Sequence, residues 1–231
     1  MGNCVILQEE NQTLIAVDTA LSCITNNGDI YRIKDKVGEK LQLIGKDAVF
    51  ICGYGNALQD MELLLPNFLD ENQYLDVANL QRYLQQNYPL AKNKLKEYKI
   101  DQIDIVIFST RNGCSESYGL LQMDNFKCRY DNASDGTKGV FSFGFDSHLF
   151  QVQAMKEFIT KQTKELKVSD VYEKLYSEIT GGEIALYTFD NCGLTFHGKY
   201  KLKEKGLNYS TAAMFNKLCL NVEYEDITAA Y

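Results

Sequence analysis

The order of the periodic segments is the feature of this sequence that most constrains its fold. Two runs rich in aliphatic residues, 5–7 and 13–17, stand on either side of a polar stretch. This pattern predicts a β-hairpin that begins at residue 3 or 4. Four further short strand patterns follow at 21–25, 29–33, 41–44 and 48–52. The first quarter of the chain is therefore predicted to be sheet, with residues near the start already taking part in it.

The period then changes to that of helices. Residues 56–65 have a helical pattern that stops at Pro66, whose nitrogen has no hydrogen to continue the helix. A second helical pattern runs from 76 to 88 and ends before Pro89. The remaining patterns are strands at 103–108, 117–123, 127–130 and 139–143, helices at 146–165 and 169–178, and strands at 183–189 and 194–200.

The resulting order is strands, two helices, strands, two helices, strands. No linker, repeat or low-complexity segment interrupts it, so we expect a single domain over residues 1–231, with 207–231 as a C-terminal extension. Amphipathic sheets and helices in this order predict an α+β fold. We expect a four-layer αββα sandwich, in which two antiparallel sheets are stacked and a pair of helices covers each outer face.

Composition excludes several classes of function. The net charge of −7 disfavours a nucleic-acid partner, because phosphates would be repelled. We find no apolar run long enough to span a membrane and no signal-peptide pattern, and expect a cytoplasmic protein. The seven cysteines never form a C-x-x-C pair, and there are only two histidines. The sequence therefore predicts no metal, no cofactor and no histidine-dependent triad.

Five short strings occur in an order that one protein family shares. They are residues 13–18 ending in Asp18, 40–44 starting with Lys40, the glycine turn at 52–60, the strand 140–144, and the turn and strand at 180–186. Together they resemble the proteasome β-subunit-like branch of the N-terminal-nucleophile hydrolases, over residues 3 to about 200.

The resemblance implies an amide or peptide hydrolase. In that family the side chain of the first residue attacks a carbonyl, and its own α-amine acts as the base. Lys40, oriented by Asp18, would favour the developing alkoxide, and the N–H of Gly55 would hold the oxyanion. The alternatives are an exposed lysine at a strand start, a turn aspartate, and a glycine at a helix entry.

The attacking residue is where the sequence departs from the family. Counting back from Asp18 by the length of the family's hairpin places Gly2 at or next to the reactive position, and glycine has no attacking atom. Cys4 would serve only after removal of residues 1–3 and with a hairpin shorter than the family's; its alternative is a buried strand cysteine. Four other positions differ from the arginine, serine, aspartate and serine expected there: Ala20, Phe145, Ser177 and Thr180.

The sequence thus predicts a proteasome-β-like fold with weak, altered or absent amide hydrolysis. One alternative is a non-catalytic subunit that self-assembles into a ring or another oligomer. The other is an amidase with Cys4 as nucleophile after N-terminal processing. The expected partners are further copies of the chain and, for an active enzyme, a peptide or small amide. Neither a nucleic acid nor a membrane is expected.

Overall fold

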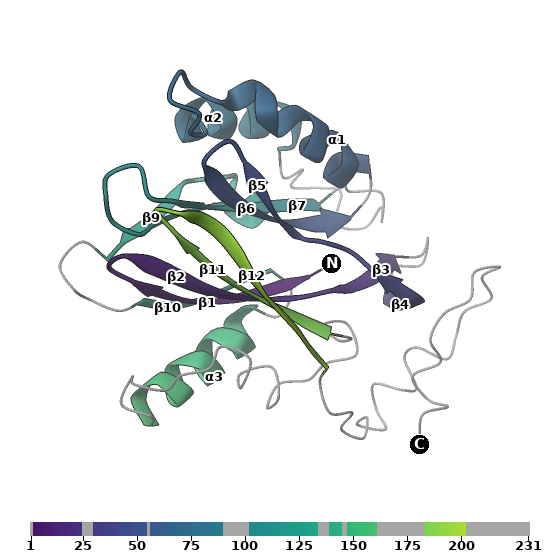
Figure 1. Cartoon of the computed structure of the whole chain (residues 1–231). Helices are drawn as coiled ribbons and strands as arrows, with labels where there is room; N and C mark the ends of the chain where they lie inside the picture. Colours follow the sequence, from purple (N-terminus) through teal and green to yellow (C-terminus); the bar gives the residue numbers. More distant parts are fainter. Residues whose placement is uncertain are drawn as a thin grey trace.

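Two antiparallel sheets of five strands each lie face to face in the computed structural model (Figure 1). The structure describes residues 2–24, 30–54, 56–89, 102–133, 139–144, 147–160 and 183–201. The first sheet has the order β10-β1-β2-β11-β12. Its strands are β1 (Asn3–Glu9), β2 (Gln12–Asp18), β10 (Gly139–Gly144), β11 (Glu183–Asp190) and β12 (Gly193–Lys201).

The second sheet has the order β5-β6-β7-β8-β9. Its strands are β5 (Leu41–Ile44), β6 (Asp47–Tyr54), β7 (Gln102–Ser109), β8 (Glu116–Leu121) and β9 (Arg129–Asn132). A separate two-stranded sheet pairs β3 (Ala20–Ile24) with β4 (Ile30–Val37). The predicted sandwich of stacked antiparallel sheets is therefore confirmed.

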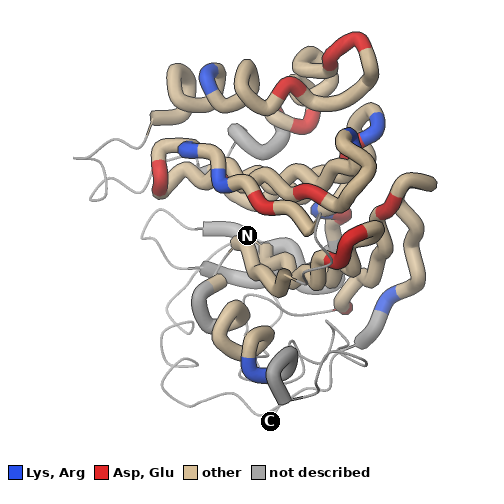
Figure 2. The backbone as a smooth tube through the Cα atoms, turned by 90° about the vertical axis from the view of Figure 1, so that its left-hand side faces the viewer, with Lys and Arg blue, Asp and Glu red and all other residues tan. Residues whose placement is uncertain are grey.

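Helices cover the outer faces of both sheets, as the edge-on view in Figure 2 shows. The second sheet is covered by α1 (Asn56–Leu64) and α2 (Val77–Asn87), and the first by α3 (Ser147–Thr160). Short 3-10 turns, η1 (Leu65–Phe68) and η2 (Gln122–Asp124), follow α1 and β8. The predicted helix at 169–178 lies outside the described residues, so the pairing of helices on that face stays a prediction. None of the described helices is long and apolar enough to cross a membrane.

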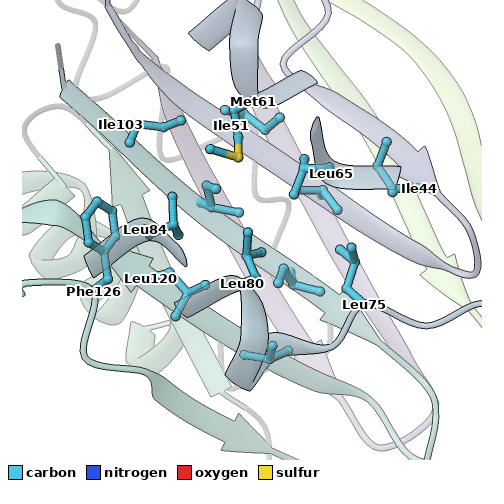
Figure 3. Packing of buried hydrophobic residues seen from close by; sticks show 14 residues of the cluster. Ile44, Ile51, Met61, Leu65, Leu75, Leu80, Leu84, Ile103, Leu120 and Phe126 are labelled. Carbon is cyan, nitrogen blue, oxygen red and sulfur yellow. The ribbon is translucent and has the colours of Figure 1, made fainter. Parts of the chain in front are cut away.

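Alternation along the strands divides the core into three layers. Cys4 and Ile6 of β1 point between the two sheets, whereas Val5 and Leu7 point toward α3. Between the second sheet and its helices, strand residues meet the apolar stripe of α2 (Figure 3). The side chains of this layer include Ile51, Met61, Leu65, Leu75, Leu80, Leu84, Ile103, Leu120 and Phe126. β1 is thus buried on both faces.

A buried polar bridge joins the two sheets at the turn of the β1–β2 hairpin. The side-chain amide of Gln8 donates to the carbonyl of Ser115 at 2.7 Å and accepts from the hydroxyl of Ser117 at 3.1 Å. The hydroxyls of Thr13 and Ser115 lie 2.6 Å apart, and the Ser115 N–H donates to the carbonyl of Glu10 at 2.8 Å. These mutually satisfied groups fix the hairpin against β8 and the loop before it.

The layer between the helices and the second sheet yields a test of the packing. Leu80 of α2 is fully buried, and we expect Leu80→Ala to lower the free energy of unfolding by about 2–5 kcal/mol, because the cavity cannot fully collapse. Leu63 of α1 is 79% exposed, and Leu63→Ala should change that free energy by less than about 0.5 kcal/mol. Urea unfolding followed by circular dichroism measures both, and equal effects would contradict this assignment of the core.

Candidate functional site

Asp18 is the centre of the predicted site, and its carboxylate is fully buried at the end of β2. One carboxylate oxygen, Oδ1, accepts the backbone N–H of Asn3 at 2.6 Å. The other, Oδ2, accepts from Nζ of Lys40 at 2.7 Å. The carboxylate therefore ties the start of β1 to the segment that precedes β5, with a partner on each oxygen.

Lys40 is held by its backbone as well as by its charge. Its carbonyl accepts the N–H of Ile51 at 2.9 Å, and the N–H of Gly38, two residues earlier, donates to the carbonyl of Thr19 at 2.9 Å. The lysine side chain is only 8% exposed. The ammonium group is thereby placed over the buried carboxylate.

Burial raises the pKa of Asp18 above its ordinary value, because a charged carboxylate loses its hydration there. The charge and hydrogen bond of Lys40 and the N–H of Asn3 act in the opposite direction. The ionised carboxylate therefore depends on its lysine partner.

Gly2 lies against this ion pair. A Cβ added to Gly2 would sit 2.8 Å from Nζ and 2.7 Å from Cδ of Lys40, and 3.1 Å from Oδ1 of Asp18. Gly144, at a φ of +95°, closes the other side, since a Cβ there would lie 2.1 Å from the carbonyl oxygen of Gly2. The structure thus brings together Gly2, Asp18 and Lys40, the residues that the resemblance groups in one site.

Cys4 lies in the layer between the sheets and is fully buried. Burial, and then the negative charge of Asp18, raise the pKa of its thiol well above the usual value. Cys52 of β6 lies in the same layer, and burial raises its pKa to about 12. Both side chains are therefore neutral thiols near neutral pH, which is the state of an inert core cysteine.

Several predicted positions cannot be assigned a place in this site. Gly55 lies outside the described residues, as do Phe145, Ser177 and Thr180. Ala20 begins β3, where the strand backbone is described and the side chain is not. Within the described ranges, no group of three histidine, cysteine, aspartate or glutamate side chains is arranged to hold a metal ion.

A small hollow adjoins the ion pair and is partly open to solvent. Besides Asp18 and Lys40, its lining includes Thr19, Glu39, Leu41, Ala185, Tyr187 and Lys199. Burial, and then the charge of Glu39, raise the pKa of Tyr187, so its hydroxyl stays protonated. Sequence reasoning missed Tyr187 and Lys199, because only the pairing of β11 with β2, and of β12 with β11, brings them here.

Comparison with known proteins bears on the fold. No protein-family model matches the sequence, and no curated protein matches it either. Among solved structures 334 chains match, and a shared architecture does not by itself select a function. One of them, Thiobacillus denitrificans BPH, is 18% identical, with a TM-score of 0.54 over 81% of this chain and 97% of that chain. The likeness is one of fold.

The Asp18–Lys40 pair predicts a pH-dependent variant. Lys40→Met should lower the free energy of unfolding by about 3–5 kcal/mol near neutral pH, because it leaves a buried carboxylate without its cation. With the lysine gone, the pKa of Asp18 rises further, so the folded variant binds a proton more readily than the unfolded chain. The difference in free energy of unfolding between the wild type and Lys40→Met should therefore shrink as the pH falls through that raised pKa toward the ordinary value of 3.8.

Urea unfolding of both proteins at about pH 7.5 and about pH 4.5 measures this difference. Lys127→Met, at an exposed position, is the matched control and should change stability by less than about 0.5 kcal/mol at either pH. A deficit of equal size at the two pH values would show that Asp18 is not the group left without a partner.

Proposed function

We propose that this chain is a proteasome-β-like protein of the N-terminal-nucleophile fold that does not hydrolyse amides through its second residue. One observation carries the proposal: the position that faces Lys40 and Asp18 holds a glycine. Acyl transfer of this type needs a hydroxyl or thiol within reach of a base and a charge-stabilising group. Lys40 and Asp18 lie beside residue 2, and this residue offers no attacking atom, which supports the proposal.

The geometry of Lys40 supports the same proposal. Its Cδ and Nζ both lie within 3 Å of the point where a Cβ of residue 2 would be. The lysine side chain therefore borders residue 2 closely, and an attacking side chain there would first have to displace it. Its ammonium forms an ion pair with Asp18 at 2.7 Å, and Asp18 in turn accepts the N–H of Asn3. The pair therefore holds the start of β1 in place.

Cys4 is the other candidate nucleophile, and its surroundings favour the core cysteine. Reaching it requires removal of residues 1–3, and with them the Asn3 N–H that Asp18 accepts. Its β1 backbone pairs with Phe143 of β10 on one side and Val17 of β2 on the other. An attack from this position would require β1, an interior strand of the first sheet, to separate from its neighbours.

The second function we propose is that of a non-catalytic subunit that associates with copies of itself. The side chains of Val152 and Met155 are 54% and 42% exposed, and the two residues lie about one turn apart on α3. Adjacent apolar side chains on an outward helix face are typical of a contact surface. The five cysteines whose side chains are described are free thiols, which agrees with the proposed cytoplasmic location. The net charge of −7 disfavours a nucleic-acid partner.

The proposal on catalysis is tested by placing a hydroxyl on residue 2. We expect the purified wild-type chain to form no adduct with a β-lactone that acylates N-terminal hydroxyls. A Gly2→Thr variant should form one, because its side chain would face Lys40 and Asp18. Intact mass and N-terminal sequencing measure the adduct and the first residue. Gly2→Val is the matched control, since it adds the same volume without the hydroxyl.

Two results would contradict this proposal. One is a wild-type adduct or amide turnover that Lys40→Met abolishes. The other is a purified chain that begins at Cys4, which would restore the cysteine alternative. If Gly2→Thr folds and stays unreactive, the geometry of the site does not support the family's chemistry.

The proposal on assembly is tested by light scattering. We expect the wild-type protein to have a mass of at least twice the 26.3 kDa of one chain. Val152→Glu should shift it toward the monomer, because a charge cannot be buried without a partner in an apolar contact. Leu63→Glu, at an exposed apolar position on the opposite helical layer, should leave the mass unchanged. A wild-type monomer at high concentration would refute the proposal.

A further inference from the structure

The loop between β7 and β8 carries an asparagine followed by a glycine in an exposed turn. Asn112 and Gly113 are both exposed, and Gly113 has a φ of +78°. A Cβ built on Gly113 would have no atom within 4 Å, so the space around its backbone is open. We propose that Asn112 is a site of spontaneous deamidation, and that its conversion loosens the polar bridge between the two sheets.

The reaction needs no group beyond the chain and water. The backbone nitrogen of Gly113 attacks the side-chain carbonyl carbon, Cγ, of Asn112 and forms a five-membered succinimide. The bond from Cγ to Nδ2 breaks, and the amide leaves as ammonia with the proton from the Gly113 nitrogen. Water then opens the ring at either carbonyl and gives aspartate or isoaspartate. Glycine favours the first step, because no side chain shields its nitrogen.

Two hydrogen bonds oppose this attack. One holds the side-chain amide of Asn112 on the carboxylate of Glu116, and the other is local to the turn. The N–H of Gly113 donates to the carbonyl of Thr110 at 3.0 Å. Because both residues of the Asn-Gly pair are exposed, opening of the turn is a local event and does not require the sheets to separate. The rate of deamidation therefore reports on the opening of this loop.

The first consequence is electrostatic. Nδ2 of Asn112 donates to Oε1 of Glu116 at 2.6 Å, and Glu116 is only 1% exposed. That carboxylate also accepts the hydroxyls of Tyr118 at 2.8 Å and Tyr130 at 3.0 Å. Deamidation replaces the amide donor with a second carboxylate. Two like charges then meet at hydrogen-bond distance beside a buried group.

The second consequence follows from chain length. Isoaspartate routes the main chain through its Cβ and adds one methylene between residues 112 and 113. Three residues after Asn112, Ser115 makes three contacts with the hairpin, through Gln8, Thr13 and Glu10. The contacts with Gln8 and Thr13 are buried. The added methylene displaces Ser115 from its partners, so the bridge weakens.

Ageing of the full-length protein at physiological temperature and mildly alkaline pH tests the proposal. Trypsin releases residues 112–127, which also contain Asn125, an exposed asparagine followed by Phe126. We expect the deamidation mass shift at Asn112 first, with isoaspartate shown by enzymatic methylation, while Asn125 stays intact. The melting temperature should fall by about 2–8 °C on ageing, as expected for the loss of one or two buried hydrogen bonds.

Asn112→Gln is the matched control, because it keeps an amide and cannot close the five-membered ring. Its melting temperature should be the same before and after ageing, which separates this site from the other Asn-Gly pair, Asn27–Gly28. Hydrogen exchange should show lost protection at the amides of Ser115 and Ala133 in the aged wild type alone. The proposal is overturned if Asn112 outlasts Asn125. It is equally overturned if Asn112 deamidates while melting and exchange stay unchanged.

Discussion

The double burial of β1 is the constraint on which the rest of the structure depends. Alternate side chains of this strand enter two different cores, one between the sheets and one under α3. A slip of one residue would exchange every side chain between those cores, so the register is fixed. With the register fixed, Gly2 must lie beside Asp18 at one end, and Gln8 must lie beside Ser115 at the other. The candidate site and the polar bridge are thus the two ends of one buried strand.

Two different kinds of polar interaction hold the two ends of β1. At the start of β1, a charged pair is used, and the desolvation of Asp18 is offset by Lys40 and the Asn3 N–H. At the hairpin turn, neutral hydroxyls and an amide satisfy each other, with no ion to desolvate. The charged end is therefore sensitive to pH, whereas the neutral end is sensitive to the geometry of the loop that supplies Ser115.

Strand alternation was enough to predict the β1–β2 hairpin, because its two strands are neighbours in sequence. The strand predicted at 117–123 ends early, at Leu121, since Asp104 accepts the N–H of Gln122 at 2.9 Å and turns the chain into η2. The grouping of Asp18 with Lys40 came from the resemblance, as periodicity says nothing about residues 22 positions apart. The place of Tyr187 beside the site could not be predicted, because local sequence patterns do not determine the order of strands in a sheet.

Two glycines meet at the candidate site for different physical reasons. Gly144 is required by the backbone: its φ is +95°, and a Cβ would strike the carbonyl oxygen of Gly2 at 2.1 Å. Gly2 has no φ in the left-handed range, and the atoms nearest to its missing Cβ belong to the flexible end of Lys40. A side chain at residue 2 would therefore need the Lys40 side chain to shift beside the Asp18 carboxylate, whereas one at residue 144 would need the strand to move. The absence of an attacking group is thus a property of the sequence at that position and not a demand of the fold.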